Sequence, residues 1–486
     1  MCSTRRTRPA CSREELGLED VAKLLYGQQR CAGVAKMKVR HVVLLPGRTT
    51  ALLAVLLLVC LAAIPLAVAC GGGEEKTPTG TGTSAAVGSP GAKLYGAAAR
   101  QATISSGPTP GISDKEILLG ADCPLGGALG AVYATIPQAT EAYFKYINDT
   151  QGGVCGRKIV YEVADNNDDP AKAMEVVRKL VEQDKVFAIV GALGDSPHPA
   201  TWDYLNANGV PDILVSVGTD MFGTDSSGHP WTVQMIASNK NEALGFGQYI
   251  SQNLPGTKVA VLIPNIIQGT DFLEGMKEGL DPDKNEIVSV QSFEMTAVSL
   301  SSQVASMKNA GAEVVTTVAA PGYTAQAIME AGRLGWHPQW ILSYINSDEM
   351  LFQFVSPPEL LNGAITFDAI KLATWTDEPA VAEHHRIMRE YDGPTPTNFT
   401  VYAQILAEVA VEALSRSCDN LTREGLMDAV ESIQDFHSDL SIDEVNISFS
   451  ETDRRALDDG RMLRAVVEDG KGRWEYFGPL WVPESE

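Results

Sequence analysis

The residue groupings that could support catalysis do not form a known catalytic pattern. Ser196 lies two positions before His198, but no GxSxG elbow surrounds the serine. His384 and His385 are adjacent, so on a helix they would point about 100° apart rather than towards one metal ion. The glycine-rich stretch 126–133 lacks both the lysine of a phosphate loop and the dinucleotide-binding spacing. We therefore expect no enzyme activity and no cofactor.

Ser196, His198 and the stretch 126–133 belong to the first of two matched segments, 113–234 and 235–365, in which short β-branched strands alternate with amphipathic helices. Asp169 and Pro170 mark one helix start, because aspartate caps free N–H groups and proline is tolerated in the first turn. In this first segment we expect strands at 117–121, 158–165, 186–192 and 212–218, and helices at 136–147, from 170, and at 202–207. This βα alternation predicts a parallel sheet covered by helices on both faces.

The second segment repeats the scheme. We expect strands at 258–264, 286–293, 313–319 and 339–343, and helices at 241–252, 271–279, 302–309 and 325–334. Further along, the sequence predicts a helix at Phe399–Ser415, a strand at Val445–Phe449 and a hairpin through Trp474. We expect one lobe from 112–235 with 366–440 and a second from 236–365 with 441–486, joined by three crossings near Ile236, Ile365 and Leu440.

The N-terminal region carries the marks of export rather than of a fold. Residues 1–36 are expected to be a non-native extension, with the true start at Met37. A basic stretch then precedes the apolar run 51–69, and Ala69 before Cys70 resembles a bacterial lipobox, so residues 37–70 are predicted to be a lipoprotein signal peptide with Cys70 lipidated. Residues 71–111 are rich in Gly, Ser, Thr, Pro and Ala and are expected to form a flexible tether.

Charge and cysteine content narrow the function classes. The chain has a net charge of −23; residues 1–70 hold 10 basic and 4 acidic residues, which leaves 28 basic against 57 acidic residues, a net charge of −29, in the remainder. Such a surface repels nucleic acid phosphates. After the predicted cleavage only Cys123, Cys155 and Cys418 remain besides Cys70. They are too few and too scattered for a typical zinc site, so we expect no metal and at most one disulfide.

Three stretches carry a family resemblance: GGVCGRKIVYEVADNNDDPAKAMEVVRKLVEQDKVFAIVGALG, then GVPDILVSVGTD, then AGAEVVTTVAAPGYTAQAIMEAGRLGW. In this order they resemble the branched-chain amino acid (Leu/Ile/Val)-binding proteins of ABC transporters, which are type 1 periplasmic binding proteins. The similarity runs from about 113 to 480. It implies an α/β fold of two Rossmann-like lobes with parallel sheets, joined by three hinge strands, that close over a small molecule and deliver it to a membrane permease.

The resemblance also implies where the ligand binds. On the first lobe, Ser196, Ser216, Gly218 and Thr219 fall where family members bind the ligand's carboxylate and amino group. Taken by themselves, these residues are equally typical of ordinary loops. Tyr133 is expected to supply an apolar wall or to be a partly buried structural residue.

Across the cleft we expect Gln268, Tyr323, Tyr344 and Asn346. Family members that bind an α-amino group often place an acidic residue at the last of these positions. Here Tyr344 or Asn346 occupies it, and Asp348 is out of register. This departure admits amides or aromatic acids as ligands besides amino acids.

The resemblance further brings the end of the long helix near Cys418 back to the first lobe, where Cys155 sits in a turn. Export to an oxidising compartment would permit a disulfide between them, whereas Cys123 is expected to stay reduced.

Together these features predict an extracytoplasmic, lipid-anchored solute-binding protein, located in the periplasm or at the cell surface. Its expected partners are a small-molecule ligand, an ABC transporter permease and the membrane that holds the lipid anchor, with no nucleic acid. A ligand-sensing receptor lobe for amides or aromatic acids is an alternative. A hydrolase of small amides is a further one.

Overall fold

The computed structural model describes residue 100 and residues 108–481. The predicted signal peptide, the lipidation site Cys70 and most of the predicted tether therefore lie outside the described residues. Of the helices in the described part of the chain, none combines the length and the apolar character that crossing a membrane requires.

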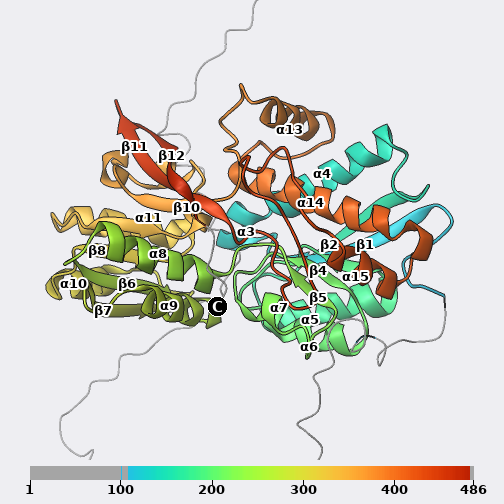
Figure 1. Cartoon of the computed structure of the whole chain (residues 1–486), viewed down its shortest axis with the longest axis horizontal. Coiled ribbons are helices and arrows are strands. Elements are labelled where there is room, and N and C mark those ends of the chain that lie inside the picture. The colour runs from blue at the N-terminus through green and yellow to red at the C-terminus, as the bar shows by residue number, and fades with distance from the viewer. Residues whose placement is uncertain (1–99, 101–107, 482–486) are drawn as a thin grey trace, which may run out of the picture. The chain divides into compact units, whose positions relative to one another are not determined.

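The first lobe contains a five-stranded parallel sheet with the order β2-β1-β3-β4-β5 (Figure 1). Its strands are β1 (Glu116–Cys123), β2 (Lys158–Asp165), β3 (Ala188–Val190), β4 (Asp212–Val215) and β5 (Thr232–Gln234). Its helices are α3 (Gly127–Tyr133), α4 (Thr135–Thr150), α5 (Pro170–Lys179), η1 (Leu180–Asp184), α6 (His198–Ala207) and α7 (Met221–Thr224). Alternate residues face opposite layers. Accordingly, Val190 packs in the same cluster as α4, and Ile189 packs with α5 and α6.

The predicted helix start at Asp169 is confirmed. The Asp169 carboxylate accepts a hydrogen bond of 2.7 Å from the backbone N–H of Lys172, and Pro170 is the first residue of α5. This cap fixes the loop between β2 and α5, which borders the cavity described below.

The second lobe contains a seven-stranded sheet with the order β12-β11-β10-β9-β8-β6-β7. Its strands are β6 (Lys258–Pro264), β7 (Glu286–Phe293), β8 (Val314–Thr317), β9 (Gln339–Leu342), β10 (Ile365–Asp368), β11 (Gly460–Glu468) and β12 (Lys471–Trp481). Its helical elements are α8 (Asn239–Asn253), α9 (Ile267–Gly279), α10 (Ser301–Asn309), α11 (Pro321–Arg333), η2 (Tyr344–Asn346), α12 (Leu351–Phe354) and η3 (Pro358–Leu361). Strands β6 to β10 are parallel, whereas β11 runs antiparallel to β10 and β12, so this sheet is mixed rather than purely parallel.

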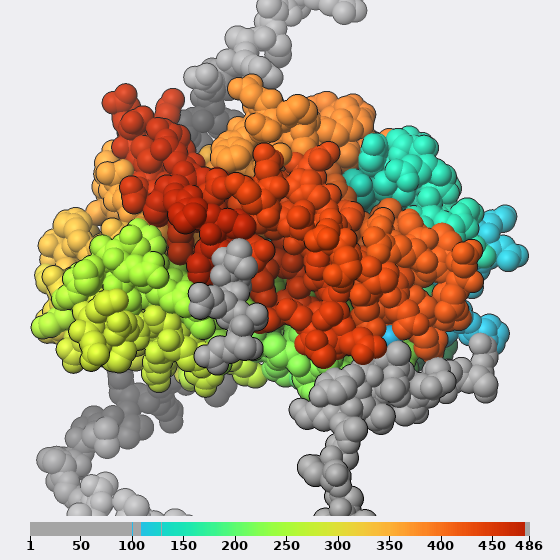
Figure 2. All heavy atoms as spheres, in the orientation of Figure 1, coloured from blue at the N-terminus to red at the C-terminus, as the bar shows by residue number. Residues whose placement is uncertain are grey.

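The chain crosses between the two sheets three times, but two crossings differ from their predicted places. Residues 366–368 complete β10 and belong to the second sheet, so the second crossing follows Asp368. Residues 442–457 pack in the core cluster of the first lobe, so the third crossing lies after Leu457 and not near Leu440. In the space-filling view this C-terminal part of the chain runs across one face of the molecule (Figure 2).

The predicted strand at Val445–Phe449 is wrong. Its alternate residues Val445, Ile447 and Phe449 are buried against the first lobe, which explains the strand-like pattern. Only an isolated bridge between Phe436 and Ile447 forms there, because no neighbouring segment continues the ladder. The predicted hairpin is confirmed as β11 and β12.

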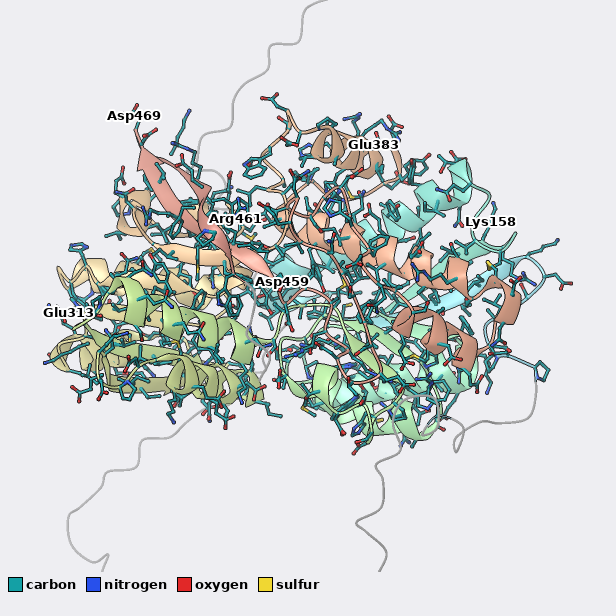
Figure 3. All side chains as sticks on the ribbon, in the orientation of Figure 1. Lys158, Glu313, Glu383, Asp459, Arg461 and Asp469 are labelled. Carbon is teal, nitrogen blue, oxygen red and sulfur yellow. A yellow bond between two sulfur atoms is a disulfide. The ribbon has the colours of Figure 1, made fainter. Side chains whose placement is uncertain are left out.

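The parallel strands of both lobes are oriented with their N-terminal ends outward. Lys158, the first residue of β2, and Glu313, directly before β8, lie on the outer sides of the two lobes (Figure 3). Asp459, at the third crossing, lies between them. The carboxyl ends of the parallel strands therefore face the crossings, which is where ligands bind in open α/β sheets.

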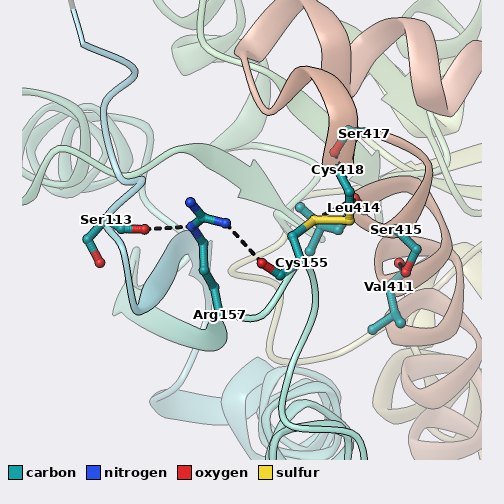
Figure 4. Close-up of a disulfide and its surroundings, with 8 residues drawn as sticks. All are labelled: Ser113, Cys155, Arg157, Val411, Leu414, Ser415, Ser417 and Cys418. Atoms are coloured by element: carbon teal, nitrogen blue, oxygen red, sulfur yellow. Dashed lines mark hydrogen bonds between the residues drawn. A yellow bond between two sulfur atoms is a disulfide. The ribbon is translucent and has the colours of Figure 1, made fainter.

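Three helices after the second crossing cover the first lobe: α13 (Pro379–Glu390), α14 (Asn398–Arg416) and α15 (Arg423–Glu431), with the short turn η4 (Cys418–Asn420) between the last two. Residues of α14 share the core cluster with α4. The predicted disulfide is confirmed: Cys155, in the turn before β2, is joined to Cys418 just beyond α14, with the two Cα atoms 5.3 Å apart (Figure 4). Cys123 is a free, buried thiol, as expected.

Candidate functional site

A cavity of about 110 Å³ lies at the carboxyl ends of the strands, and both lobes line it. All three crossings also contribute to its walls, through Ile236 and Ala237, Asp368 to Ile370, and Leu457. An engineered apolar cavity of about 150 Å³ holds one benzene molecule, so the space suits a solute of a few heavy atoms without further opening. A cavity bounded by every connection between two lobes changes shape whenever the lobes move.

Six of the nine ligand-binding residues expected from the sequence line this cavity: Tyr133, Ser196, Ser216, Gly218, Gln268 and Tyr344. They come from distant parts of the chain. The strand ends and the crossings bring them together.

Thr219, Tyr323 and Asn346 are not in the cavity lining. The backbone carbonyl of Thr219 accepts a hydrogen bond from Gln234, and its own hydroxyl is buried without a partner among the described residues. The hydroxyl of Tyr323 donates to the backbone carbonyl of Met295, and the side-chain amide of Asn346 donates to that of Ala319 at 3.0 Å. Met295 does line the cavity, so Tyr323 contributes to the cavity wall only by holding Met295 in place.

Backbone and hydroxyl groups shape the first-lobe wall near Ser216 and Gly218. The hydroxyls of Ser216 and Tyr402 are 2.6 Å apart and hydrogen-bonded. A Cβ atom on Gly218 would lie 2.0 Å from Oδ1 of Asn239 and 2.8 Å from the hydroxyl of Tyr344. Only glycine therefore fits at 218, where this loop of the first lobe meets Asn239 and Tyr344 beyond the first crossing.

Three carboxylates in the lining were not predicted as site residues: Asp168, Asp195 and Asp368. Burial raises the pKa of Asp195 to about 7, and the nearby charge of Asp168 adds to the effect. Burial likewise raises the pKa of Asp168 to about 6 and that of Asp368 to about 7. Asp168 and Asp195 follow β2 and β3 by a few residues, and Asp368 ends β10. Their position after parallel strands is the sequence signal that could have identified them.

An acidic residue also stands behind Tyr344, although it comes from α8 rather than from the predicted position. The carboxylate of Glu242 accepts hydrogen bonds from the hydroxyl of Ser343 at 2.8 Å and from the backbone N–H of Tyr344 at 2.6 Å. Burial raises the pKa of Glu242 to about 8. Glu242 thus anchors the loop that carries Tyr344 and does not itself line the cavity.

The geometry around Ser196 and His198 gives the histidine a structural role. His198 is completely buried, and its Nε2 atom lies 3.1 Å from a carboxylate oxygen of Asp212, which is also buried. Burial opposes the charged form of the imidazole, but the Asp212 carboxylate leaves the pKa of His198 raised. This pair fixes the start of α6 beneath the loop that carries Ser196.

Among residue 100 and residues 108–481, no three His, Cys, Asp or Glu side chains come together in a way that could hold a metal ion.

Comparison with known proteins places this geometry in context. A family model described as periplasmic binding protein matches residues 116–471. The Leu/Ile/Val-binding protein homolog 1 of Brucella abortus (strain 2308) is 24% identical over 222 residues, which cover 46% of this chain and 58% of the relative. The chain therefore spans somewhat more than half the length of this relative.

Two solved structures share the fold at low identity. A fatty acid ABC transporter substrate-binding protein from Thermomonospora curvata is 23% identical, with a TM-score of 0.67, over 77% of this chain and 94% of that one. A branched chain amino acid ABC transporter from Thermus thermophilus with bound valine is 18% identical, with a TM-score of 0.68, over 77% of this chain and 98% of that one. Their ligands differ from each other, so the ligand of this chain has to be inferred from its own residues.

Proposed function

The chain belongs to the periplasmic binding protein family, and we propose that it captures a small solute between its lobes and delivers it to an ABC importer. The observation that carries the proposal is the cavity lined by both lobes and by all three crossings. A solute in that position contacts every segment that moves when the lobes rotate. Binding would therefore stabilise the closed arrangement, in the manner of hinge closure around a ligand.

Solute binding can be tested without knowing the ligand. A thermal-shift screen of amino acids, amides, carboxylic acids and amines should reveal a compound that raises the melting temperature, because a ligand bound only by the folded state stabilises it. Small-angle scattering should then show a smaller radius of gyration with that compound than with an inactive one. A binding compound that leaves the dimensions unchanged would contradict closure.

A matched pair of variants links binding to the cavity. Ser196 lines the cavity, whereas Ser302 is exposed on α10. We expect Ser196→Tyr to abolish the ligand-induced rise in melting temperature by filling the space, and Ser302→Tyr to leave it unchanged. Equal responses of the two variants would place the binding site elsewhere.

The proposed location is extracytoplasmic, with Cys70 as a lipidated mature N-terminus. Support comes from the apolar run 51–69 followed by Ala69, Cys70 and a polar, glycine-rich stretch. Metabolic labelling with a fatty acid should mark the wild-type protein and not Cys70→Ser. A Cys70→Ser protein that remains membrane-bound at the mature size would refute the anchor.

Delivery to a permease is the last part of the proposal. Deleting the chain from its host should abolish uptake of the solute found by screening, while leaving the permease in the membrane. Unimpaired uptake, with loss of a transcriptional response to the solute, would favour the sensing alternative.

A further inference from the structure

All charged side chains in the described lining of the cavity are negative. They are Asp168, Asp195 and Asp368, and no lysine, arginine or histidine lines it. The two lobes otherwise contribute hydroxyl, amide, aromatic and aliphatic groups. The inference drawn here rests on the proposed function, because it names the class of solute that the cavity binds.

Two of these carboxylates lack partners among the described residues. Among the described residues, Oδ1 of Asp195 is shielded from solvent and has no hydrogen-bond partner. Asp168 is half-buried, and none of the described residues donates a hydrogen bond to its carboxylate. The third is held in place, because Asp368 accepts hydrogen bonds from the hydroxyl of Ser347 and, at 2.8 Å, from the backbone N–H of Ala369. Buried carboxylate oxygens without donors are unfavourable, so a solute that supplies donors or positive charge would stabilise them.

Asp195 also lies close to the start of α6. Asp195 stands three residues before His198, the first residue of α6, in the loop that leads into that helix. The N-terminus of a helix carries partial positive charge and favours an anion. Asp195 places its own carboxylate in this loop, so a solute carboxylate that approached this end of α6 would meet a like charge.

The second lobe adds an acceptor that has no partner. Gln268, at the beginning of α9, is only 7% exposed and lines the cavity. Its side-chain amide makes no hydrogen bond with the described residues. The side-chain amide of Gln268 carries an acceptor oxygen as well as an NH₂ donor, and its oxygen can accept a hydrogen bond from an ammonium group.

Aromatic rings surround the same space. Tyr133 and Phe399 pack edge to face with ring centroids 5.4 Å apart, and both line the cavity together with Tyr344 and Tyr402. The faces of aromatic rings attract cations, most strongly where water is excluded. Carboxylates and aromatic faces together form the environment that recognises alkylammonium groups.

We propose that the solute is a small organic cation, an amine or a quaternary ammonium compound, and not a carboxylic acid. Amines bring both positive charge and N–H donors to the unpartnered oxygens of Asp195 and Gln268. A quaternary ammonium group would rely on the carboxylates and aromatic faces alone. The carboxylate of an amino or fatty acid would face three acidic side chains without a cationic partner.

A set of leucine analogues tests the amino group and the carboxylate separately on one carbon skeleton. Leucine carries both groups, 3-methylbutylamine is leucine without its carboxylate, 4-methylpentanoate is leucine without its amino group, and 3-methylbutan-1-ol is uncharged. Choline and its uncharged isostere 3,3-dimethylbutan-1-ol form a second comparison. By calorimetry we expect at least one cation to bind about tenfold or more tightly than its uncharged analogue, and 4-methylpentanoate to be the weakest of its series.

The outcomes separate this inference from the proposed function. If a carboxylate or an uncharged solute binds and the cations do not, the inference is overturned and solute binding stands. If no compound of any class binds the folded protein, both are overturned. A rise in melting temperature with MgCl₂ or CaCl₂, and none with the organic cations, would also overturn the inference.

Removing the carboxylate charges provides a second test. A purely structural role of these residues would predict a different change in melting temperature. Asp195→Asn and Asp168→Asn should each weaken cation binding about tenfold or more, and should raise the melting temperature of the ligand-free protein, because each relieves an unpartnered carboxylate. Asp114→Asn is the matched control, since Asp114 is exposed and outside the cavity. Loss of affinity together with a lower melting temperature in both cavity variants would indicate a structural role and overturn the inference.

Discussion

The two lobes present chemically different walls to one cavity. The first lobe contributes two carboxylates and the hydroxyls of Ser196 and Ser216. The part of the second lobe that follows β6, β7 and β8 contributes apolar side chains and the amide of Gln268, and the second lobe's one lining carboxylate, Asp368, lies at the end of β10 beside the second crossing. A charged wall can hold a solute while the cavity is open to water. An aliphatic wall gains free energy only when water leaves. The difference therefore suggests an order of events, in which the first lobe binds the solute and the second closes over it.

The lobes also differ in how they are stabilised. The first is closed by the bond between Cys155 and Cys418, which links segments 263 residues apart, while the second relies on its mixed sheet and two core clusters. The lobe that binds first is thus covalently braced.

The largest effect should come from removing this bond. Cys155→Ser combined with Cys418→Ser should lower the free energy of unfolding by about 2–5 kcal/mol, because the unfolded chain regains the freedom that the cross-link removes. Chemical denaturation measures the change, and a reducing agent should reproduce it in the wild type and have no further effect on the variant. Equal stability of the two proteins would show that the brace is dispensable.

Reversing a charge on the first-lobe wall should have the next largest effect. Asp195→Lys should weaken binding of the preferred cation by about 100-fold or more, corresponding to about 2.7 kcal/mol, and should strengthen binding of 4-methylpentanoate. Calorimetry measures both changes. The control is Asp114→Lys, which alters the net charge equally at an exposed position. Equal losses of affinity for the cation and for 4-methylpentanoate would indicate a damaged fold rather than an altered specificity.

Changing the second-lobe wall should cost less. Gln268→Leu removes one acceptor from the cavity wall and should weaken cation binding by about 20-fold, within the range of about 1.5–3 kcal/mol for a hydrogen bond to a charged group. Because this wall acts after capture, stopped-flow measurements should place the change in the dissociation rate. A change mainly in the association rate would refute the proposal that the first lobe binds the solute before the second closes.

The smallest change should follow pH. Asp195 faces Asp168, Tyr133 and Tyr344, and its pKa of about 7 means that it ionises as the pH rises through that value. Cation affinity should therefore fall about tenfold from pH 8 to pH 6, since the protonated carboxyl no longer attracts the cation. An uncharged solute should show little change over this range.

The same groups set how ligand-free stability responds to pH. The folded-state pKa values of Asp168 and Asp195 lie above their ordinary value of 3.8, so between about pH 4 and pH 7 the folded protein binds more protons than the unfolded chain. Through these groups, the free energy of unfolding should decrease as the pH rises across that interval. In Asp195→Asn the decrease should be shallower. An unchanged slope would show that Asp195 does not titrate there.

Long strands with clear apolar patterns could be predicted from the sequence. The bounds of β2, β6 and β7 match their predicted ranges, because each is a run of seven or eight residues, rich in β-branched and apolar side chains, between turn residues. The places of the second and third crossings could not be predicted in the same way. Residues 442–457 look like a strand of either lobe, and only tertiary packing assigns them to the first.

The residues of the site could likewise be predicted only in part from the sequence. The family resemblance implied hydroxyl and glycine positions after β3 and β4, and Ser196, Ser216 and Gly218 do line the cavity, whereas Thr219 does not. Asp168 and Asp195 occupy equivalent places but look like ordinary turn residues. Asp368 could not be identified, because a crossing and no strand was expected near Ile365, whereas residues 365–368 form β10 and pair with β11.

The interleaved order of the lobes has a consequence for biosynthesis. The first core needs residues as far as Leu457, and the second sheet gains β11 and β12 only from residues 460–481. Until residues 442–481 have been synthesised, both lobes lack part of their native packing, because these contacts join segments far apart in sequence. For a chain exported as proposed, this order would keep the growing polypeptide incompletely packed, and so able to pass through a secretion channel, until that stretch is complete.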